Sequence, residues 1–514
     1  MFCKSYCGAI VGVEAFIIQV EADINDGLPV FNLVGLLSSE VKEAKERVRS
    51  AIKNMGFRLP PKRIILNLSP ADIRKEGTAY DLSIAMSLLG IIGCVETSMF
   101  DKILFVGELG LDGHINSVKG VIPLVIAAKK RGFKYCIVPK DNSREGALVQ
   151  GIGIIGSDNL SDVISIVNSG EYDDYVIPKE RWEPKSCHGF DKDFSDVAGQ
   201  YMVKRAAEIA AAGGHNMLMI GPPGTGKTMI AERIPGIMPF LTQDESIEVS
   251  GIYSVYGGLK HCSGYIYNRP FRTPHHSIPR TGLVGGGNIP MPGEISLAHK
   301  GVLFLDELTE FPRNIIELLR QPLENDSIIH TRSNISIQYP CDFILIAAMN
   351  PCPCGYFPDK KKCTCTPLQI KKYLGKISHA FLDRIDLIVD VNQINYDMFN
   401  CEQGESSEII RSRVEKAVMI QQKRYMGRSI SGNSRLNSEG IKKWCYLSEE
   451  DKEYLCAAYE QLGMSARTYH KTLKVARTIA DLDGSNYILR KHLKEAIFYR
   501  SIDNKYNVME GNVI

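Results

Sequence analysis

The stretch GPPGTGKT, residues 221–228, constrains the fold of this 514-residue chain more than any other feature. It fits the pattern G-x-x-x-x-G-K-[ST], with an apolar run, MLMI, before it and a helix-forming run, TMIAERI, after it. Its glycines let backbone amides turn inward around phosphate oxygens, and the start of the next helix adds its positive end. The order strand, loop, helix therefore predicts a phosphate-binding loop at the edge of a parallel sheet.

The side chains of this loop have separate expected roles. Lys227 would reach the β- and γ-phosphates of ATP, and the Thr228 hydroxyl would bind Mg²⁺. A glycine-rich turn without a ligand is the alternative, which the flanking strand and helix disfavour. The residues predicted to bind the nucleotide here are Gly221, Pro222, Pro223, Gly224, Thr225, Gly226, Lys227 and Thr228.

Two later apolar runs end in polar side chains. VLFLDEL, residues 302–308, predicts a buried strand that ends in Asp306 and Glu307, 79 residues after Lys227. Alone, such an acidic pair is more often a helix cap. After a phosphate loop, we expect Asp306 to hold Mg²⁺ and Glu307 to polarise the attacking water. FILIAAMN ends in Asn350, which we expect to sense the γ-phosphate, with its strand between the other two; simple turn chemistry is the alternative.

Composition sets broad limits on the class of protein. The length fits about two to four domains, and 44% hydrophobic and 23% charged residues are typical of globular chains. A net charge of +2 gives no overall basic coat for nucleic acid. The longest apolar stretch, 82–95, is too short to span a membrane, and Glu14 interrupts any signal-peptide core. We therefore expect a cytoplasmic protein whose fourteen cysteines stay reduced.

The hydrophobic pattern predicts an α/β multidomain chain. Residues 1–168 form an α+β domain, residues 169–195 a polar linker, residues 196–400 a core with a parallel sheet, and residues 401–514 a helical lid. The strands expected in the first domain are 15–20, 63–68, 103–106 and 135–138, and its helices are 40–55, 79–89 and 118–130. In the lid, the helices expected are 466–482 and 490–501.

Several segments together resemble one family. The chain resembles the AAA+ ATPases, and more narrowly the magnesium-chelatase-like YifB or ComM family, in GPPGTGKT, RPFRTPHHSIPRTGLVGGGNIPMPGEISLAHKGVLFLDEL, MNPCPCG, LDRIDL and SARTYHKTLKVARTIADL. The likeness extends to GLPVFNLVGLLSSEVKEAKERVRSAI and LNLSPADIRKEG, so it covers nearly the whole chain. It implies an ATPase that uses Mg²⁺ and assembles into a homo-oligomeric ring, a hexamer by family likeness.

The resemblance also assigns two arginines. Arg384 in LDRID matches the finger that completes the site of a neighbouring subunit, and Arg467 in SAR matches the sensor arginine of the lid. Both would neutralise charge on the γ-phosphate, and with Glu307 and Asn350 they make up the predicted catalytic set. A surface ion pair is the ordinary alternative for either arginine.

The first domain resembles the ribosomal S5 domain 2-like fold shared with the Lon protease domain, through KEGTAYDLSIAMSLLG and FVGELGLDGHINSVKGVIPLVIAAKKRG. Thr78 stands about where that protease has its serine, and Ile122 stands where it has its lysine, with Lys119 close but out of register. Since no base is in place to activate a nucleophile, we expect a binding or assembly module and not a protease.

Two loops of the core could touch a substrate. The resemblance implies an insertion within the second core helix, and the glycine- and proline-rich segment 281–293 predicts a mobile loop there. IIHTRSNISIQY predicts a hairpin whose Arg332, Ser333 and Asn334 would contact phosphates or simply favour solubility. His275 and His276 are not expected to bind a metal, because adjacent side chains point different ways on regular structure.

Four cysteines follow Asn350 in the spacing C-x-C-x8-C-x-C: Cys352, Cys354, Cys363 and Cys365. They could bind structural Zn²⁺ or an iron–sulfur cluster, or simply be free buried thiols. A metal would make a rigid basic finger of the loop that carries Lys360, Lys361 and Lys362.

For function, the resemblance implies a ring that acts on branched or single-stranded DNA, as a branch-migration helicase in recombination and natural transformation. The alternatives are a magnesium-chelatase-type motor subunit, a protein-remodelling ATPase and a nucleotide-regulated binding module. Sequence-specific DNA recognition is not expected, because no base-reading motif occurs.

Overall fold

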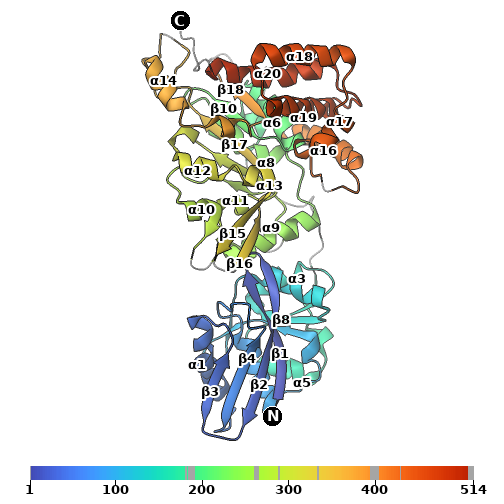
Figure 1. Ribbon diagram of the computed structural model, residues 1–514. Helices are drawn as coiled ribbons and strands as arrows, with labels where there is room; N and C mark the ends of the chain where they lie inside the picture. Colours follow the sequence, from blue (N-terminus) through green and yellow to red (C-terminus); the bar gives the residue numbers. More distant parts are fainter. Residues whose placement is uncertain are drawn as a thin grey trace.

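The fold is taken from a computed structural model that describes residues 2–179, 182, 192–259, 265–287, 290–332, 335–359, 361–393, 404–428 and 430–507. The chain is long in one direction (Figure 1). The sheets of the first half lie at one end, the main parallel sheet lies in the middle, and the C-terminal helices lie at the other end.

The first half is built on two sheets. One has the order β1-β2-β4-β3, antiparallel except between β3 and β4, and the other is the parallel sheet β5-β8-β9. Along β2, Ile18, Val20, Ala22 and Ile24 are buried alternately, as in a strand with one face on a core. The strands are β1 (Phe2–Val11), β2 (Glu14–Asn25), β3 (Val30–Val34), β4 (Arg63–Ser69), β5 (Ile103–Phe105), β6 (Glu108–Leu109), β7 (Ile115–Asn116), β8 (Tyr135–Pro139) and β9 (Gly153–Ser157).

Helices cover these sheets. They are α1 (Ser39–Asn54), α2 (Asp81–Ile91), α3 (Val121–Arg131), α4 (Lys140–Ala147) and α5 (Leu160–Ser169). All four strands and all three helices expected in this half are present. The expected elements did not include β1, β3, β9, α4 or α5. The strands β3 and β9 have only five residues each, whereas the apolar residues of α5 (Leu160, Val163, Ile164 and Val167) do follow a helical period, so this helix could have been predicted.

The first part of the expected linker packs on this half. Tyr172–Tyr175 form a 3-10 turn, and Val176 pairs with Ile155 at the edge of β9. Residues 180–181 and 183–191 of the linker lie outside the described residues.

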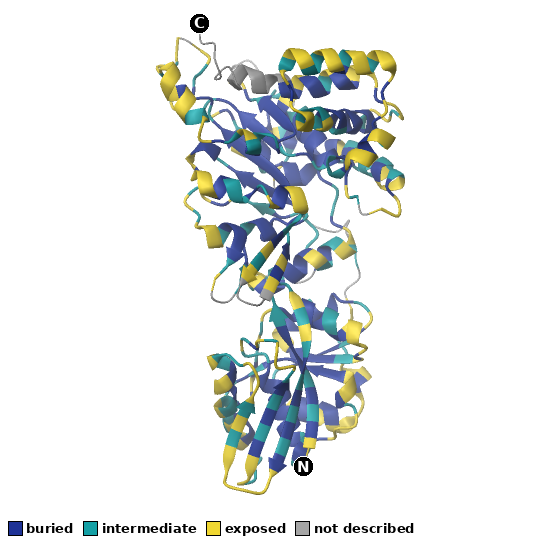
Figure 2. Ribbon diagram, in the orientation of Figure 1, coloured by how far each residue is buried: buried dark blue, intermediate teal, exposed yellow. Residues whose placement is uncertain are grey.

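The second half contains a five-stranded parallel sheet with the order β11-β14-β17-β10-β18. Every residue of β10, β14 and β17 is buried, so the middle of the molecule is its most continuous core (Figure 2). As expected, the strand before Asn350 lies between the other two. The strands are β10 (Met217–Ile220), β11 (Phe271–Arg272), β14 (Val302–Leu305), β17 (Ile344–Met349) and β18 (Leu387–Asp390).

Helices and short hairpins surround this sheet. The helices are α6 (Tyr201–Gly213), α7 (Lys227–Ala231), α8 (Ile234–Ile237), α9 (Gln243–Tyr256), α10 (Arg280–Val284), α11 (Glu294–Leu297), α12 (Arg313–Leu318), α13 (Pro322–Asn325), α14 (Pro367–Leu374) and α15 (His379–Leu382). The hairpins are β12 (Gly285–Gly286) with β13 (Met291–Pro292), and β15 (Ser327–Arg332) with β16 (Ile335–Pro340).

The insertion expected as a mobile loop over 281–293 has regular structure instead. It contains α10 and the β12–β13 hairpin, while residues 288–289 lie outside the described part. Gly285 has φ 98°, and a Cβ on Gly293 would clash with the backbone of Gly285. The glycines thus allow two chain segments to approach closely. Composition alone cannot distinguish this role from that of glycines in a flexible loop.

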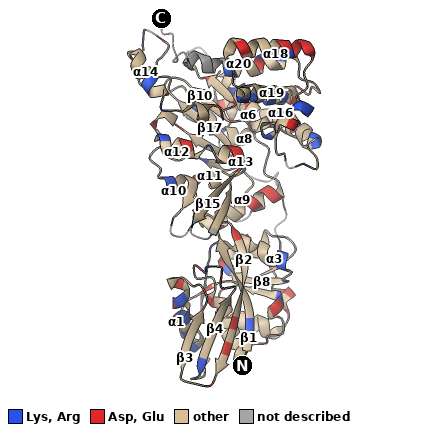
Figure 3. Cartoon of the chain, in the orientation of Figure 1, with Lys and Arg blue, Asp and Glu red and all other residues tan. Residues whose placement is uncertain are grey.

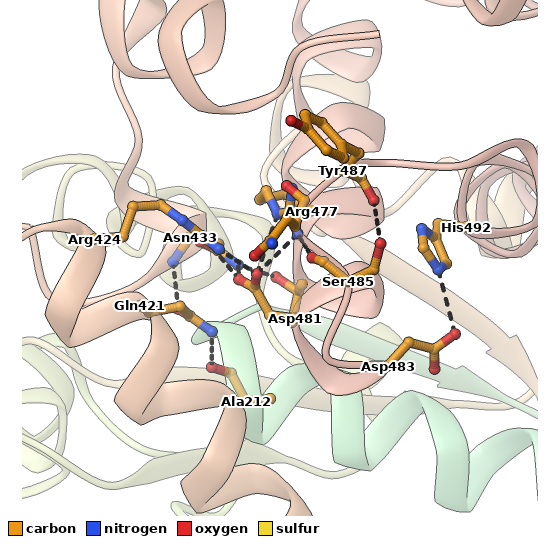
Figure 4. Close-up of polar contacts among 12 residues, drawn as sticks. Ala212, Gln421, Arg424, Asn433, Arg477, Asp481, Asp483, Ser485, Tyr487 and His492 are labelled. Atoms are coloured by element: carbon orange, nitrogen blue, oxygen red, sulfur yellow. Dashed lines mark hydrogen bonds and ion pairs between the residues drawn. The ribbon is translucent and has the colours of Figure 1, made fainter. Parts of the chain in front are cut away.

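The C-terminal part is helical, with α16 (Ser407–Arg424), α17 (Ser438–Trp444), α18 (Glu449–Leu462), α19 (Ala466–Leu482) and α20 (Arg490–Asn507). A buried polar network joins these helices (Figure 4). The fully buried Asp481 carboxylate pairs with Arg424 at 2.5 Å and Arg477 at 3.0 Å and accepts from Asn433 at 2.8 Å. Gln421 donates to the carbonyl of Ala212, which ties α16 to α6 of the core.

The two halves meet through α3, α9 and the β15–β16 hairpin. The amide of Gly120 donates to the carbonyl of Ser254 at 3.1 Å, and the amide of Ile122 donates to the Ser254 hydroxyl at 3.4 Å. Gly12, in the β1–β2 turn, has φ 68° and lies so close to Ile337 of β16 that any side chain there would clash. The first half therefore rests on the second through specific contacts.

Among the residues described, no helix combines the length and the apolar character that crossing a bilayer requires.

Candidate functional site

The phosphate loop, residues 221–228, connects the buried strand β10 to helix α7. A side chain on Gly221 would clash with the carbonyl of Val391, so the close approach to the end of β18 requires glycine. Gly224 and Gly226 have φ of 74° and 86°, which favour glycine. The Thr225 hydroxyl donates to the carbonyl of Pro222 at 2.9 Å and closes the turn.

Lys227 is folded back onto its own loop. Its ammonium donates to the carbonyls of Gly221 at 2.7 Å and Pro222 at 2.8 Å and to Oδ1 of Asn350 at 3.2 Å. Burial lowers the pKa of Lys227, although the Asp306 and Glu307 carboxylates act in the opposite direction. A phosphate group at this loop would give the buried ammonium the anionic partner that these neutral oxygens do not provide.

The acidic pair lies beside the loop. The Thr228 hydroxyl donates to Oδ2 of Asp306 at 2.6 Å, so a hydroxyl and a carboxylate meet where they could hold Mg²⁺. Glu307 has a left-handed φ of 49°, and its side chain is 61% exposed. Its amide donates to Oδ1 of Asp306 at 2.9 Å. The structure thus brings together Lys227, Thr228, Asp306, Glu307 and Asn350 at the carboxyl ends of three adjacent strands.

His276 adds to this site a residue that the sequence did not connect with it. Its Nδ1 lies 3.8 Å from Oε2 of Glu307, and its ring lies 4.0 Å from that of His275, centroid to centroid. The expectation that the two rings point apart was wrong, because they lie in an irregular segment between β11 and α10. In the part of the chain that the structure describes, they belong to no group of three or more metal-binding side chains.

A cavity of about 450 Å³ opens beside the acidic pair. Its lining includes Glu307, Asn350, Pro353, Lys372, Tyr373 and Lys376. Two lysines thus stand near the glutamate expected to act on water, in a space large enough for part of a nucleotide.

Arg384 and Arg467 lie together, but at the amino-terminal ends of the strands, opposite the phosphate loop. Nη2 of Arg384 pairs with Oε1 of Glu324 at 2.5 Å, and Nη2 of Arg467 lies 3.7 Å from the same oxygen. The side-chain amide of Asn216, the residue before β10, donates to the carbonyl of Arg384. Asn216 and Gly221 are separated by the length of β10, roughly 16 Å at the usual strand rise. Neither arginine is therefore placed to reach the phosphate loop of its own chain.

The two segments expected near a substrate, the loop 281–293 and the hairpin after the acidic pair, are in contact. Nε2 of His330, in β15, lies 3.1 Å from the carbonyl oxygen of Val284 at the end of α10. Of the three residues expected to contact phosphates, Ser333, Asn334 and the side chain of Arg332 lie outside the described residues.

The cysteine cluster, Cys352, Cys354, Cys363 and Cys365, follows directly from the end of β17. Its four sulfurs lie within 4.8 Å of one another and could hold a metal ion. Cys352 is buried and the other three are half-buried. Lys361 and Lys362 lie on the loop between the cysteine pairs, and Lys360 lies outside the described residues.

In the first half, the Thr78 hydroxyl donates to the Glu108 carboxylate, and Ile122 is fully buried in an apolar cluster. Ile122 cannot act as a base, and the group that accepts from Thr78 is a carboxylate and not the lysine amine of the protease pattern. The absence of protease activity stays a prediction.

Comparisons with known proteins find similar sequences over nearly the whole chain. Family models described as "Magnesium chelatase, subunit ChlI", "Subunit ChlI of Mg-chelatase" and "Magnesium chelatase, subunit ChlI C-terminal" match residues 193–399, 20–142 and 404–500. The chain is 43% identical over 500 residues to the competence protein ComM of Haemophilus influenzae, covering 97% of each. It is also 43% identical over 497 residues to YifB of Escherichia coli, covering 96% of each. The magnesium-chelatase 38 kDa subunit of Cereibacter sphaeroides is 24% identical over 181 residues, 31% of this chain and 52% of that protein.

Proposed function

Since this chain belongs to the YifB/ComM family of magnesium-chelatase-like AAA+ proteins, we propose that it is an Mg²⁺-dependent ATPase that works as a ring on DNA. The ring is a hexamer by family likeness, and its activity is branch migration of recombination intermediates in the cytoplasm. Its cofactors are ATP and Mg²⁺.

Hydrolysis in this proposal uses the residues around the phosphate loop. Lys227 exchanges its carbonyl partners for the β- and γ-phosphates, and Thr228 with Asp306 holds the Mg²⁺ that neutralises phosphate charge. Glu307 accepts a proton from the attacking water, while Asn350 orients that water or the γ-phosphate. The protein contributes positioning and charge, because phosphoryl transfer needs little covalent help.

The position of Arg384 is the observation that supports assembly into a ring. An arginine finger stabilises the charge of the transition state, yet Arg384 stands a strand length away from its own phosphate loop. A head-to-tail neighbour would bring one subunit's Arg384 and Arg467 to the next subunit's site, and such heterologous contacts close into rings. The active unit is therefore an interface between two copies of the chain.

Three features support DNA as the substrate. The relative with 43% identity is called a competence protein, and the family likeness implies a branch-migration helicase. Helix α10, which leads into the β12–β13 hairpin, contacts β15 of the other hairpin, as expected of segments that line one channel. Lysines and arginines alternate with acidic residues along the chain (Figure 3) and the net charge is only +2, so a phosphate contact would have to be local and non-specific.

The direct test is the ATPase rate of the full chain with Mg²⁺ and no additive, single-stranded DNA, a four-way junction, or an unfolded protein. We expect strong activation by DNA that weakens as salt rises, since phosphate contacts release counterions. Activation by unfolded protein alone would indicate remodelling. Indifference to both, with basal hydrolysis intact, would favour the chelatase-type motor and refute the DNA proposal.

A further inference from the structure

The cysteine cluster has the dimensions of a site for one tetrahedral ion. Four thiolates at 2.3 Å from a central zinc stand about 3.8 Å apart at the corners of a tetrahedron. The sulfur of Cys352 lies 3.3 Å from that of Cys354 and 3.8 Å from that of Cys363, and the last two lie 3.6 Å apart. All four sulfurs lie within 4.8 Å of one another. The spacing therefore fits a single ion with four sulfur ligands.

Other uses of the four thiols fit less well. Disulfide sulfurs are about 2.0 Å apart, far closer than these. An iron–sulfur cube is held by cysteines that each bind a different iron, so their sulfurs stand farther apart than ligands of one ion. Thiols that only fill a core would be buried, whereas three of these four are half-buried. Convergence on one point near the surface is typical of a structural metal site.

The backbone around the cluster is arranged to hold it. The amide of Gly355 donates to the carbonyl of Cys352 at 3.0 Å and makes a tight turn after the first pair. The amide of Phe357 donates to the Cys352 sulfur at 3.4 Å, the type of outer contact that stabilises a thiolate ligand. Before the second pair, the amide of Cys363 donates to the carbonyl of Asp359 at 2.8 Å. The loop thus folds so that both pairs meet.

The cluster also touches the phosphate loop. Gly355 has φ 87°, and a Cβ on it would lie only 2.5 Å from Cδ of Pro223. The turn between Cys354 and the rest of the loop therefore packs on the phosphate loop without a side chain between them. A metal ion that ordered the cysteine loop would therefore also hold Pro223 of the phosphate loop in place.

A second connection runs through α14, which begins two residues after Cys365. The Thr366 hydroxyl caps this helix by accepting from the amide of Gln369. At the other end of α14, Tyr373 accepts from the Thr309 hydroxyl at 2.6 Å, and Lys376 donates to the Thr309 carbonyl at 3.0 Å. The helix forms one wall of the 450 Å³ cavity beside Glu307.

We propose that Cys352, Cys354, Cys363 and Cys365 bind one structural Zn²⁺, and that this ion fixes the wall of the ATP site formed by Pro223 and α14. The zinc itself is independent of the proposed function; only the effect on the ATP site rests on it. The ion takes no part in hydrolysis. It joins the two ends of a loop whose flanks touch the phosphate loop and the segment after the acidic pair.

The test begins with the metal content of the full wild-type chain, purified without a polyhistidine tag from medium that contains zinc and iron. We expect about one zinc per chain. Cobalt in its place should give the visible absorption of a tetrahedral ion with thiolate charge-transfer bands. A chain with no metal, or one that holds iron, overturns the zinc site, whatever its ATPase activity.

Two variants then test the ligands and the coupling. Cys363→Ser should lose the zinc, whereas Cys456→Ser, at an exposed free cysteine on α18, should keep it. A fluorescent ATP analogue should bind Cys363→Ser at least about fivefold more weakly than wild type, and Cys456→Ser equally well. Zinc retained by Cys363→Ser overturns the ligand set. Unchanged affinity in a folded, zinc-free variant overturns the coupling.

If Cys363→Ser does not fold, the coupling is tested on the cobalt-loaded wild-type chain, whose spectrum is recorded with and without the ATP analogue. Absorption bands that do not respond to the nucleotide overturn the coupling.

Discussion

Replacing Arg384 by alanine should remove the finger while leaving the ATP-binding residues of the same chain in place. Loss of such an arginine lowers kcat by about 10³- to 10⁵-fold. The cost in stability should be about 1–3 kcal/mol, because the Arg384 side chain is only 8% exposed although its partner Glu324 is 48% exposed. We therefore expect a folded variant that binds ATP and scarcely hydrolyses it.

Mixing variants shows whether Arg384 acts on a neighbour. An Arg384→Ala subunit keeps its phosphate loop, and a Lys227→Ala subunit keeps its finger. In a ring mixed randomly from equal amounts, each interface has one chance in two of the right loop and one in two of the right finger. About one quarter of the interfaces are then complete. The mixture should reach roughly a quarter of wild-type activity, although each variant alone has almost none.

The assay is steady-state ATP hydrolysis at fixed total protein, across a series of mixing ratios. Two affinity tags, one on each variant, establish that mixed assemblies form. Activity should peak near equal amounts and vanish at both ends of the series. If co-assembled variants stayed as inactive as each alone, Arg384 would not act across an interface, and the ring argument would fail.

Three further predictions use single substitutions. Lys227→Ala should weaken ATP binding by about 3 kcal/mol or more, over 100-fold, because the loop loses its fixed cation; calorimetry that finds wild-type affinity refutes the assignment. Glu307→Gln should bind ATP normally but hydrolyse it orders of magnitude more slowly and trap an assembled ring, seen by gel filtration with ATP; near-normal turnover would mean that another base acts. Asp481→Asn should lower the free energy of unfolding by about 3–5 kcal/mol in urea titrations, because it leaves the buried Arg477 and the half-buried Arg424 short of a counter-charge. Glu449→Gln, at an exposed ion pair, should change it by no more than about 0.5 kcal/mol; equal effects would contradict the role of the network.

The sequence predicted the fold best where an apolar run is followed directly by a residue of the ATP site. The fully apolar runs before Gly221, Asp306 and Asn350 predicted β10, β14 and β17, because strands buried on both faces need continuous apolar side chains. The helix expected over 466–482 is present as α19, since its start and its apolar period are both clear.

Contacts between distant segments could not be predicted in this way. Arg384 and Arg467 were each assigned by resemblance, but nothing in their local sequence shows that both face Glu324. The contact of His276 with Glu307 depends on an irregular segment that has no period. The spacing of the four cysteines showed a cluster, and only coordinates give distances that separate a one-ion site from a larger one.

The contact between Gly12 and Ile337 limits how freely evolution or engineering could exchange the first domain. A turn of one half and a hairpin of the other fit so closely that a methyl group on Gly12 would meet Cγ2 of Ile337, and one of the two would have to shift. A chimera that took residues 1–168 from a relative would need that relative's hairpin as well, or a compatible residue at position 337. The amide contacts to Ser254 add a second point that must match. The first half is thus matched to the second at two points, and exchanging it alone would disturb both.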